Sequence, residues 1–369
     1  MSDHTTIVAA DLYAVSLPYA EAKTWTIGGV ETESHYVLLK LTDSAGRVGA
    51  AEVVCKPAWN GMEQPVLLAA FEHLAWPLLA GKEATGEAQA AALCKSLAGS
   101  LAPVSLADNA WRDMVSPWPE ALRGVKVPGT KVLTRDTPAK MADEARKAVL
   151  EEGYPCLKIK IGQGLEIDGQ VLAAINQAVS DAAVLTADAN SAYKPGEVSE
   201  LDRLMAGHGV VFLEDPCPLM PDAAAEEVIR GCSLPVVVDR SGSPLGMAMA
   251  FADRGATHFS VKPSRISQSE GHAVAGLVQG LGGGVCFGTY AEGSLGALNQ
   301  IGFVAHYVSD PLFLSAEIDF HRELLGDYLH APVRFEDGCF MLPAEGNAAA
   351  QVDWDKVAGL AKAHVALTI

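Results

Sequence analysis

The sequence predicts an α/β fold, in which a (β/α)7β barrel follows a small α+β domain. Two observations predict it. Between residues 126 and 320, short runs of β-forming residues alternate regularly with helical patterns, which is typical of parallel strands joined by helices. Before residue 126, strands come first and helices follow, which indicates a separate α+β unit.

The α+β domain is expected over residues 1–125. Alternating apolar and polar residues predict strands over 7–17 and 34–54, with a hairpin turn at 43–46 in the second region. Helical patterns follow at 63–80, 86–101 and 105–115, and Gly81 is a suitable helix cap. A stretch with several prolines and glycines near residues 118–128 is the expected linker.

The barrel is expected over residues 126–320, with the remaining segment at 321–369. Helical patterns such as 138–152, 168–179 and 198–206 separate the strands. Seven strand–helix units and a closing strand favour a barrel, and a doubly wound open sheet is the alternative. No GxGxxG or phosphate-loop spacing follows the first strand, which argues against nucleotide binding. The expected strands are 130–135, 155–161, 183–189, 210–215, 235–239, 258–262, 285–290 and 312–316.

Composition argues against several classes of protein. A formal charge of −18 disfavours a nucleic-acid or anionic-membrane partner. No apolar run reaches the roughly 18 residues of a membrane span, and no signal-peptide pattern follows the polar N-terminus. The 7 cysteines are scattered and lack CxxC spacing, which predicts a reduced cytoplasmic protein without disulfides or structural zinc.

Charged residues stand at the carboxyl ends of successive expected strands, the face on which barrels carry active sites. Taken singly, each has an ordinary explanation. A strand-end aspartate is often a helix N-cap, a strand-end lysine is usually solvated, and a glutamate before Ser294 could cap the next helix. Their repetition on strand after strand favours one shared site. The residues are Lys158, Lys160, Asp188, Glu214, Asp239, Lys262 and Glu292.

This set of side chains indicates a particular chemistry. Three carboxylates from adjacent strands, without histidine or cysteine, suit Mg²⁺. Burial, a second lysine and a nearby cation all disfavour a charged lysine, so we expect a fraction of these lysines to be neutral near pH 7. A metal flanked by lysines fits removal of a proton next to a carboxylate, with the metal stabilising the enediolate charge.

In these motifs the sequence resembles the enolase superfamily. The resemblance is to its muconate-lactonizing-enzyme (muconate cycloisomerase) subgroup, within the mandelate racemase/muconate lactonizing enzyme family. It covers nearly the whole chain and implies a TIM-like barrel with an N-terminal capping domain that the C-terminal segment completes. The matching motifs are KIK on strand two, DAN on strand three, ED on strand four, Asp239 on strand five, KPSR on strand six and GTYAEGSLGA near strand seven.

The resemblance also implies roles for the residues. Lys160 and Lys262 would be the acid/base pair on opposite faces of the substrate, and Lys158 a supporting charge. Glu292 matches a glutamate that lies at the site of muconate cycloisomerases. The implied Mg²⁺ ligands, which would also accept Mn²⁺, are Asp188, Glu214 and Asp239.

The sequence departs from relatives of this kind at one position, and another feature separates it from a neighbouring subgroup. Arg240 follows Asp239, where a glutamate is usual. Lys262 stands on strand six and no matching histidine follows on strand seven, which disfavours the mandelate racemase subgroup. Dipeptide epimerases carry an acidic pair near strand eight that holds an ammonium group. Glu317 and Asp319 leave that alternative open.

The expected function is that of an Mg²⁺-dependent isomerase acting on a carboxylate, either a cycloisomerase or a racemase/epimerase. Alternatives are a dehydratase or lyase, such as an o-succinylbenzoate-synthase-like enzyme, and a non-catalytic carboxylate-binding barrel. Two cap stretches, 19–31 and 55–62, correspond to loops that close over the site in the family. A homo-oligomer, from dimer to octamer, is also expected. The expected substrate-binding residues are Trp25, Trp59, Asn190 and Arg240.

Overall fold

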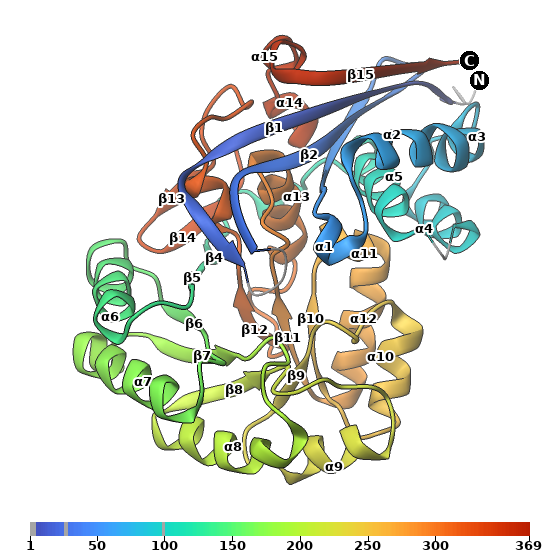
Figure 1. Cartoon of the computed structure of the whole chain (residues 1–369). Coiled ribbons are helices and arrows are strands. Elements are labelled where there is room, and N and C mark those ends of the chain that lie inside the picture. The colour runs from blue at the N-terminus through green and yellow to red at the C-terminus, as the bar shows by residue number, and fades with distance from the viewer. Residues whose placement is uncertain (1–4, 26–28, 98–99) are drawn as a thin grey trace.

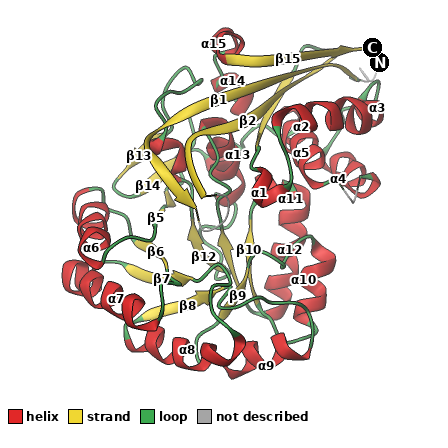
Figure 2. Ribbon diagram, in the orientation of Figure 1, coloured by secondary structure: helices red, strands yellow, loops and turns green. Residues whose placement is uncertain are grey.

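The computed structural model describes residues 5–25, 29–97 and 100–369. In it the chain forms an eight-stranded parallel sheet wrapped by helices, with an antiparallel sheet and its own helices above (Figures 1 and 2). The predicted combination of a (β/α)7β barrel and an α+β cap is therefore confirmed. Within these described ranges, no helix has both the length and the apolar character needed to cross a bilayer.

The cap sheet has the strand order β15-β1-β2-β3, and all its neighbouring pairs are antiparallel. Its strands are β1 (Ile7–Trp25), β2 (Gly29–Asp43), β3 (Val48–Val54) and β15 (Ala361–Thr368). The predicted turn at 43–46 joins β2 to β3. β1 is longer than predicted because it continues past Pro18, where the register shifts before pairing with β2 resumes at Lys23.

Helices pack on one face of the cap sheet around a separate apolar core that includes Leu39, Phe71 and Trp111. The predicted helix over 63–80 is broken by a π-helical turn at Phe71–Ala75. The third predicted helix starts earlier than expected because Pro103 is accommodated in its first turn, where no N–H is needed. The cap helices are α1 (Pro57–Asn60), α2 (Gln64–Ala70), α3 (Trp76–Leu79), α4 (Glu87–Ser96) and α5 (Leu101–Val115).

The barrel strands pair in sequence order, which excludes the doubly wound sheet because that fold reverses its strand order. Between the first and last strands, the Ala316 N–H donates to the Thr130 hydroxyl at 3.3 Å. The strands are β5 (Thr130–Leu133), β6 (Cys156–Lys160), β7 (Val184–Asp188), β8 (Val210–Glu214), β9 (Val236–Val238), β10 (His258–Val261), β11 (Gly284–Phe287) and β12 (Phe313–Ala316).

Helices surround these strands (Figure 1). α6 shows how local sequence starts them: the Thr137 hydroxyl accepts the Lys140 N–H, and Pro138 occupies the first turn. The barrel helices are α6 (Pro138–Arg146), α7 (Leu165–Val179), α8 (Val198–Gly207), α9 (Ala223–Gly231), α10 (Leu245–Ala252), α11 (Pro263–Ile266), α12 (Gln268–Leu281) and α13 (Ser294–Val304).

The C-terminal segment links the two parts of the molecule. Its strands β13 (Arg334–Glu336) and β14 (Cys339–Met341) form a small sheet with β4 (Val127–Pro128). Helices α14 (Ala348–Gln351) and α15 (Trp354–Leu360) lead to β15, which pairs with β1. The chain thus returns to the cap, while the exact domain limits at residues 125 and 320 stay predictions.

Buried polar contacts fix the cap on the barrel. The Ser105 hydroxyl on α5 donates to the Pro263 carbonyl at 2.8 Å, next to Lys262. Glu52 on β3 accepts the Gly293 N–H at 2.6 Å, at the start of α13, and also contacts the Tyr328 hydroxyl. Both contacts join the cap to loops at the carboxyl ends of barrel strands, so the cap directly shapes the mouth of the barrel.

Candidate active site

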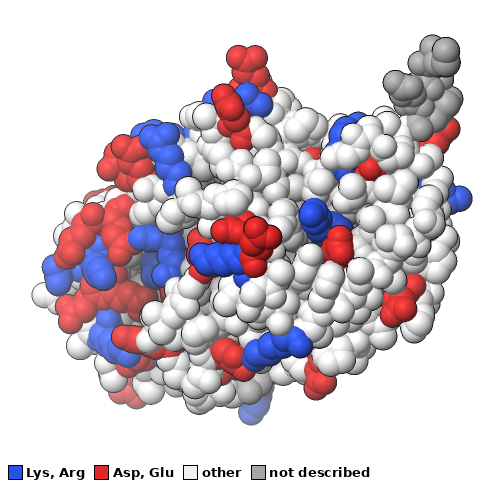
Figure 3. Space-filling view, turned by 90° about the horizontal axis from the view of Figure 1, so that it is seen from above, with Lys and Arg blue, Asp and Glu red and all other residues white. Residues whose placement is uncertain are grey.

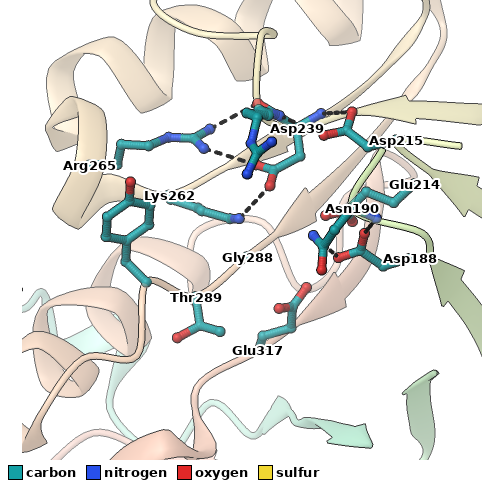
Figure 4. Close-up of polar contacts among 12 residues, drawn as sticks. Asp188, Asn190, Glu214, Asp215, Asp239, Lys262, Arg265, Gly288, Thr289 and Glu317 are labelled. Atoms are coloured by element: carbon teal, nitrogen blue, oxygen red, sulfur yellow. Dashed lines mark hydrogen bonds and ion pairs between the residues drawn. The ribbon is translucent and has the colours of Figure 1, made fainter. Parts of the chain in front are cut away.

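The predicted charged residues meet at the carboxyl ends of neighbouring barrel strands. In the sheet register, Lys160 on β6 lies opposite Asp188 on β7, which in turn lies opposite Glu214 on β8. Asp239 and Lys262 come directly after β9 and β10. Figure 4 shows side chains from these strand ends turned toward one space.

Lys158 lies in the floor of this site, with only 2% of its surface exposed. Its Nζ lies 2.8 Å from Glu214 Oε1, 2.9 Å from Glu317 Oε1 and 3.1 Å from Asp188 Oδ2. Burial alone would lower the pKa of Lys158, but the attraction of these carboxylates raises it well above its usual range. Lys158 is therefore a fixed positive charge under the site.

Lys160 and Lys262 face the space above from opposite sides of the barrel. Lys160 Nζ lies 2.5 Å from Asp188 Oδ2, and Lys262 Nζ lies 2.6 Å from Asp239 Oδ2. Burial lowers the pKa of Lys262, but Asp239 outweighs it, and the net direction is upward. The expectation of partly neutral lysines is therefore wrong for Lys158 and Lys262 as they stand here, because each is paired with a carboxylate.

The three predicted metal ligands are all buried. Within the described ranges, no group of three or more Asp, Glu, His or Cys side chains is arranged so that it could hold a metal ion. The reason is visible in the contacts: Asp188 turns to Lys160, Glu214 to Lys158, and Asp239 to Lys262 and Arg265. These ion pairs hold the three carboxylates on different cations, and Asp188 also lies 3.1 Å from Lys158.

The chemistry of the same carboxylates nevertheless fits a hard cation. Burial raises the pKa of Asp188 and Asp239, but their cationic partners outweigh it and hold both below the usual range. Burial raises the pKa of Glu214 well above its usual range, since the single ammonium of Lys158 is shared among several carboxylates. Glu214 Oε2 is buried and has no hydrogen bond within the described structure. An unpaired oxygen in an all-carboxylate set suits Mg²⁺.

A cavity of about 510 Å³ opens above these residues, between the barrel and the cap. Lys160, Lys262 and Asp239 line its barrel side. The cap side includes Trp59, whose ring meets that of Tyr290 edge-on at a centroid distance of 5.3 Å. The volume is in the range of small-molecule sites.

Three of the four expected substrate-binding residues line this cavity: Trp59, Asn190 and Arg240. Asn190 also supports Asp188, because its N–H donates to Asp188 Oδ1 at 2.8 Å. Trp25 ends β1, but its side chain lies outside the described part of the structure, and its expected role stays a prediction.

A family model described as "Enolase C-terminal domain-like" matches residues 140–355. The chain belongs to that family. Its place in the enolase superfamily and its nature as an enzyme are therefore confirmed.

Relatives in this family carry several related activities. The N-succinylamino acid racemase of Thermus thermophilus is 28% identical over 306 residues, covering 80% of this chain and 81% of the relative. The hydrophobic dipeptide epimerase of Citrifermentans bemidjiense is 26% identical, with 86% and 90% covered. In fold, the muconate lactonizing enzyme of Pseudomonas fluorescens complexed with muconolactone matches with a TM-score of 0.87 at 20% identity, covering 97% of this chain and 100% of that one.

Glu292 lies in the loop after β11. It is buried and does not line the cavity. Its carboxylate contacts the Ser264 hydroxyl and accepts hydrogen bonds from the Thr289 hydroxyl at 2.6 Å and the Tyr290 N–H at 2.9 Å. It does not cap α13, whose N-cap is Gly293. Glu292 thus holds the loop after β11, and its expected catalytic role stays a prediction.

The acidic pair near strand eight is split between two environments. Glu317 lines the cavity and binds Lys158. Asp319 does not line it, and pairs instead with Lys131 at 3.2 Å. Of the two carboxylates, only that of Glu317 therefore faces the cavity, and the ammonium site of a dipeptide epimerase stays a prediction.

Two site residues were not singled out from the sequence. Asp215 directly follows Glu214, and its carboxylate accepts the Asp239 and Arg240 N–H groups at 3.1 and 3.0 Å. Burial raises the pKa of Asp215 to about 6. Arg265 ends the KPSR motif and lies 3.1 Å from Asp239 Oδ1 (Figure 4). Asp215 and Arg265 lie inside the recognised ED and KPSR motifs, and their place in those motifs was the available signal.

Proposed function

We propose that the protein is an Mg²⁺-dependent isomerase that removes the α-proton of a carboxylate substrate, acting as a racemase/epimerase or as a muconate cycloisomerase-like enzyme. The observation that carries this proposal is that Lys160 on β6 and Lys262 after β10 line one cavity from strands on opposite sides of the barrel. A racemase and an epimerase among the curated relatives support the reaction type.

The two lysines divide the work between the faces of the substrate. One neutral amine takes the α-proton from its face, and the ammonium opposite returns a proton to the other face. Lys262 acts as a base only when Asp239 is engaged elsewhere, since that ion pair favours the charged form of the lysine. Lys158 keeps a fixed positive charge beneath the substrate.

The carboxylates beneath the lysines supply the ligands for the metal ion that the proposed reaction requires. Asp188, Glu214 and Asp239 would hold Mg²⁺, which supplies positive charge where the substrate carboxylate becomes more negative. Trp59 and the other cap residues over the cavity exclude water from the reacting carbon. Water exclusion strengthens every electrostatic interaction in the site.

We further propose a cytoplasmic homo-oligomer with no nucleic-acid partner. The six cysteines whose side chains are described are free thiols, which supports a reducing compartment. On the face in Figure 3, lysines and arginines lie beside acidic residues rather than in a continuous basic stripe. A nucleic-acid site would need such a stripe.

Proton exchange in D₂O tests the proposal. A panel of chiral carboxylates is incubated with enzyme and Mg²⁺ and followed by NMR. Deuterium uptake at the α-carbon with inversion indicates racemisation or epimerisation, ring closure or opening indicates cycloisomerisation, and a new olefin with loss of a leaving group indicates a lyase.

Variants assign the two faces. Lys160→Ala should stop exchange from one stereoisomer and Lys262→Ala from the other, each by about 10²–10⁴-fold. Lys158→Ala should weaken both, and Lys140→Ala, a surface lysine on α6, should change neither. Near-normal exchange on both faces in Lys160→Ala and Lys262→Ala would refute the proposal.

A further inference from the structure

Among the described residues, the side chains that line the cavity are mostly cationic, while the carboxylates of Asp188 and Glu214 lie beneath them. Five cationic side chains line it against two carboxylates, those of Asp239 and Glu317. The rest of the molecule has the opposite balance, with a formal net charge of −18. A positive, partly enclosed cavity in an acidic protein attracts and retains anions.

Most of these cations already have partners. Lys160, Lys262 and Arg265 each pair with a carboxylate. Arg135 has no carboxylate partner among the described residues, but its guanidinium donates to the carbonyls of Ile161 at 2.7 Å and Ala189 at 3.1 Å. Arg135 thus braces the ends of β6 and β7 and adds positive charge to the cavity wall.

Arg240 is different from the other four. Within the described structure its side chain has neither a hydrogen bond nor an ion pair, and it is exposed at the cavity. It is not needed to neutralise Asp239, because Lys262 and Arg265 already contact that carboxylate. Its backbone is nevertheless fixed, since its N–H donates to Asp215 at 3.0 Å. A guanidinium without a partner in the described structure therefore extends from a fixed backbone position into the cavity.

We propose that the substrate carries a second carboxylate and that Arg240 binds it. This inference rests on the proposed function, in which the first carboxylate lies over the buried acidic cluster between Lys160 and Lys262. A guanidinium presents a planar fork that pairs with both oxygens of a carboxylate. The same cavity disfavours a substrate with a distal ammonium group, because Asp319 faces Lys131 outside the cavity.

Binding of matched ligands tests the inference without requiring turnover. Succinate, glutarate, adipate and pimelate are compared with the monocarboxylates of the same chain lengths, in the presence of Mg²⁺, by isothermal titration calorimetry. At least one diacid should bind more tightly than its monoacid. Arg240→Gln should weaken that diacid about 10-fold or more, since hydrogen bonds between charged groups contribute about 1.5–3 kcal/mol. It should weaken the monoacid much less.

Two controls keep the result interpretable. Arg203→Gln removes an exposed arginine on the outer helix α8 and should leave both affinities unchanged. Arg240→Lys keeps the charge but not the fork, and should recover only part of the diacid affinity. Equal binding of diacids and monoacids, no diacid binding, or equal weakening of both by Arg240→Gln would overturn the inference. Deuterium exchange on monocarboxylates would still report on the proposed function separately.

Discussion

Gly288, which directly follows β11, gives Lys262 the room to reach its position. A Cβ atom at Gly288 would lie 2.5 Å from Lys262 Cε and 2.7 Å from the Ser260 hydroxyl oxygen (Figure 4). Gly288→Ala should therefore displace the ammonium and reduce exchange on the face that Lys262 serves, with little change in melting temperature. The measurement is face-resolved deuterium exchange. Gly276→Ala on α12, where a Cβ atom meets nothing within 4 Å, is the matched control. Normal exchange in Gly288→Ala would show that Lys262 can shift away from the added methyl group and still exchange protons.

At the scale of elements, Lys56 joins two cap segments that border the site. It is 2% exposed, contacts the Glu31 carboxylate on β2, and lies 4.8 Å from the ring centroid of Trp59, which lines the cavity. Lys56→Met should loosen both segments, because a partly buried ion pair and a cation–π contact are lost together. Hydrogen exchange of the amides at 19–25, 29–31 and 55–62 should become faster. Glu31→Gln should act similarly, and Lys82→Met should not.

Unchanged exchange in Lys56→Met would mean that packing alone holds these segments.

At the scale of elements, the local sequence predicts the strands but not the contacts between distant segments. The eight barrel strands follow from local alternation and length, and the structure places each within a few residues of its predicted range. The Lys56–Glu31 and Lys131–Asp319 pairs could not be foreseen, because each depends on how distant segments pack. The site lysines could be predicted, but the raised pKa values of Lys158 and Lys262 depend on which carboxylate each one meets.

For the whole molecule, two buried carboxyl groups couple folding to pH. Burial raises the pKa of Glu52 to about 7 and that of Asp113 to about 7, although both accept backbone hydrogen bonds. Since the folded state holds these protons more tightly than the unfolded chain, their stabilisation is full below the ordinary carboxyl pKa and is lost as pH rises through about 7. One pKa unit corresponds to about 1.4 kcal/mol. The joint contribution of Glu52 and Asp113 to the free energy of unfolding should therefore fall by several kcal/mol from pH 4 to 8.

Urea denaturation at a series of pH values measures this dependence. Glu52→Gln and Asp113→Asn should each flatten the curve in this range, whatever their effect on absolute stability. Glu345→Gln, at an exposed carboxylate, should leave the slope unchanged. A slope unaffected by both buried substitutions would assign the pH dependence to other groups.

The strand β15 has a consequence for the order in which the molecule is assembled during synthesis. β1 pairs with β2 on one side and with β15 on the other, and the whole barrel lies between them in the chain. A ribosome therefore releases β1 long before its second neighbour exists. Until residues 361–368 emerge, the outer edge of β1 lacks its hydrogen-bond partner, and unpaired edges are where chains associate wrongly. The cap begins first and is finished last, so the catalytic barrel can be complete before the cap sheet over it is closed.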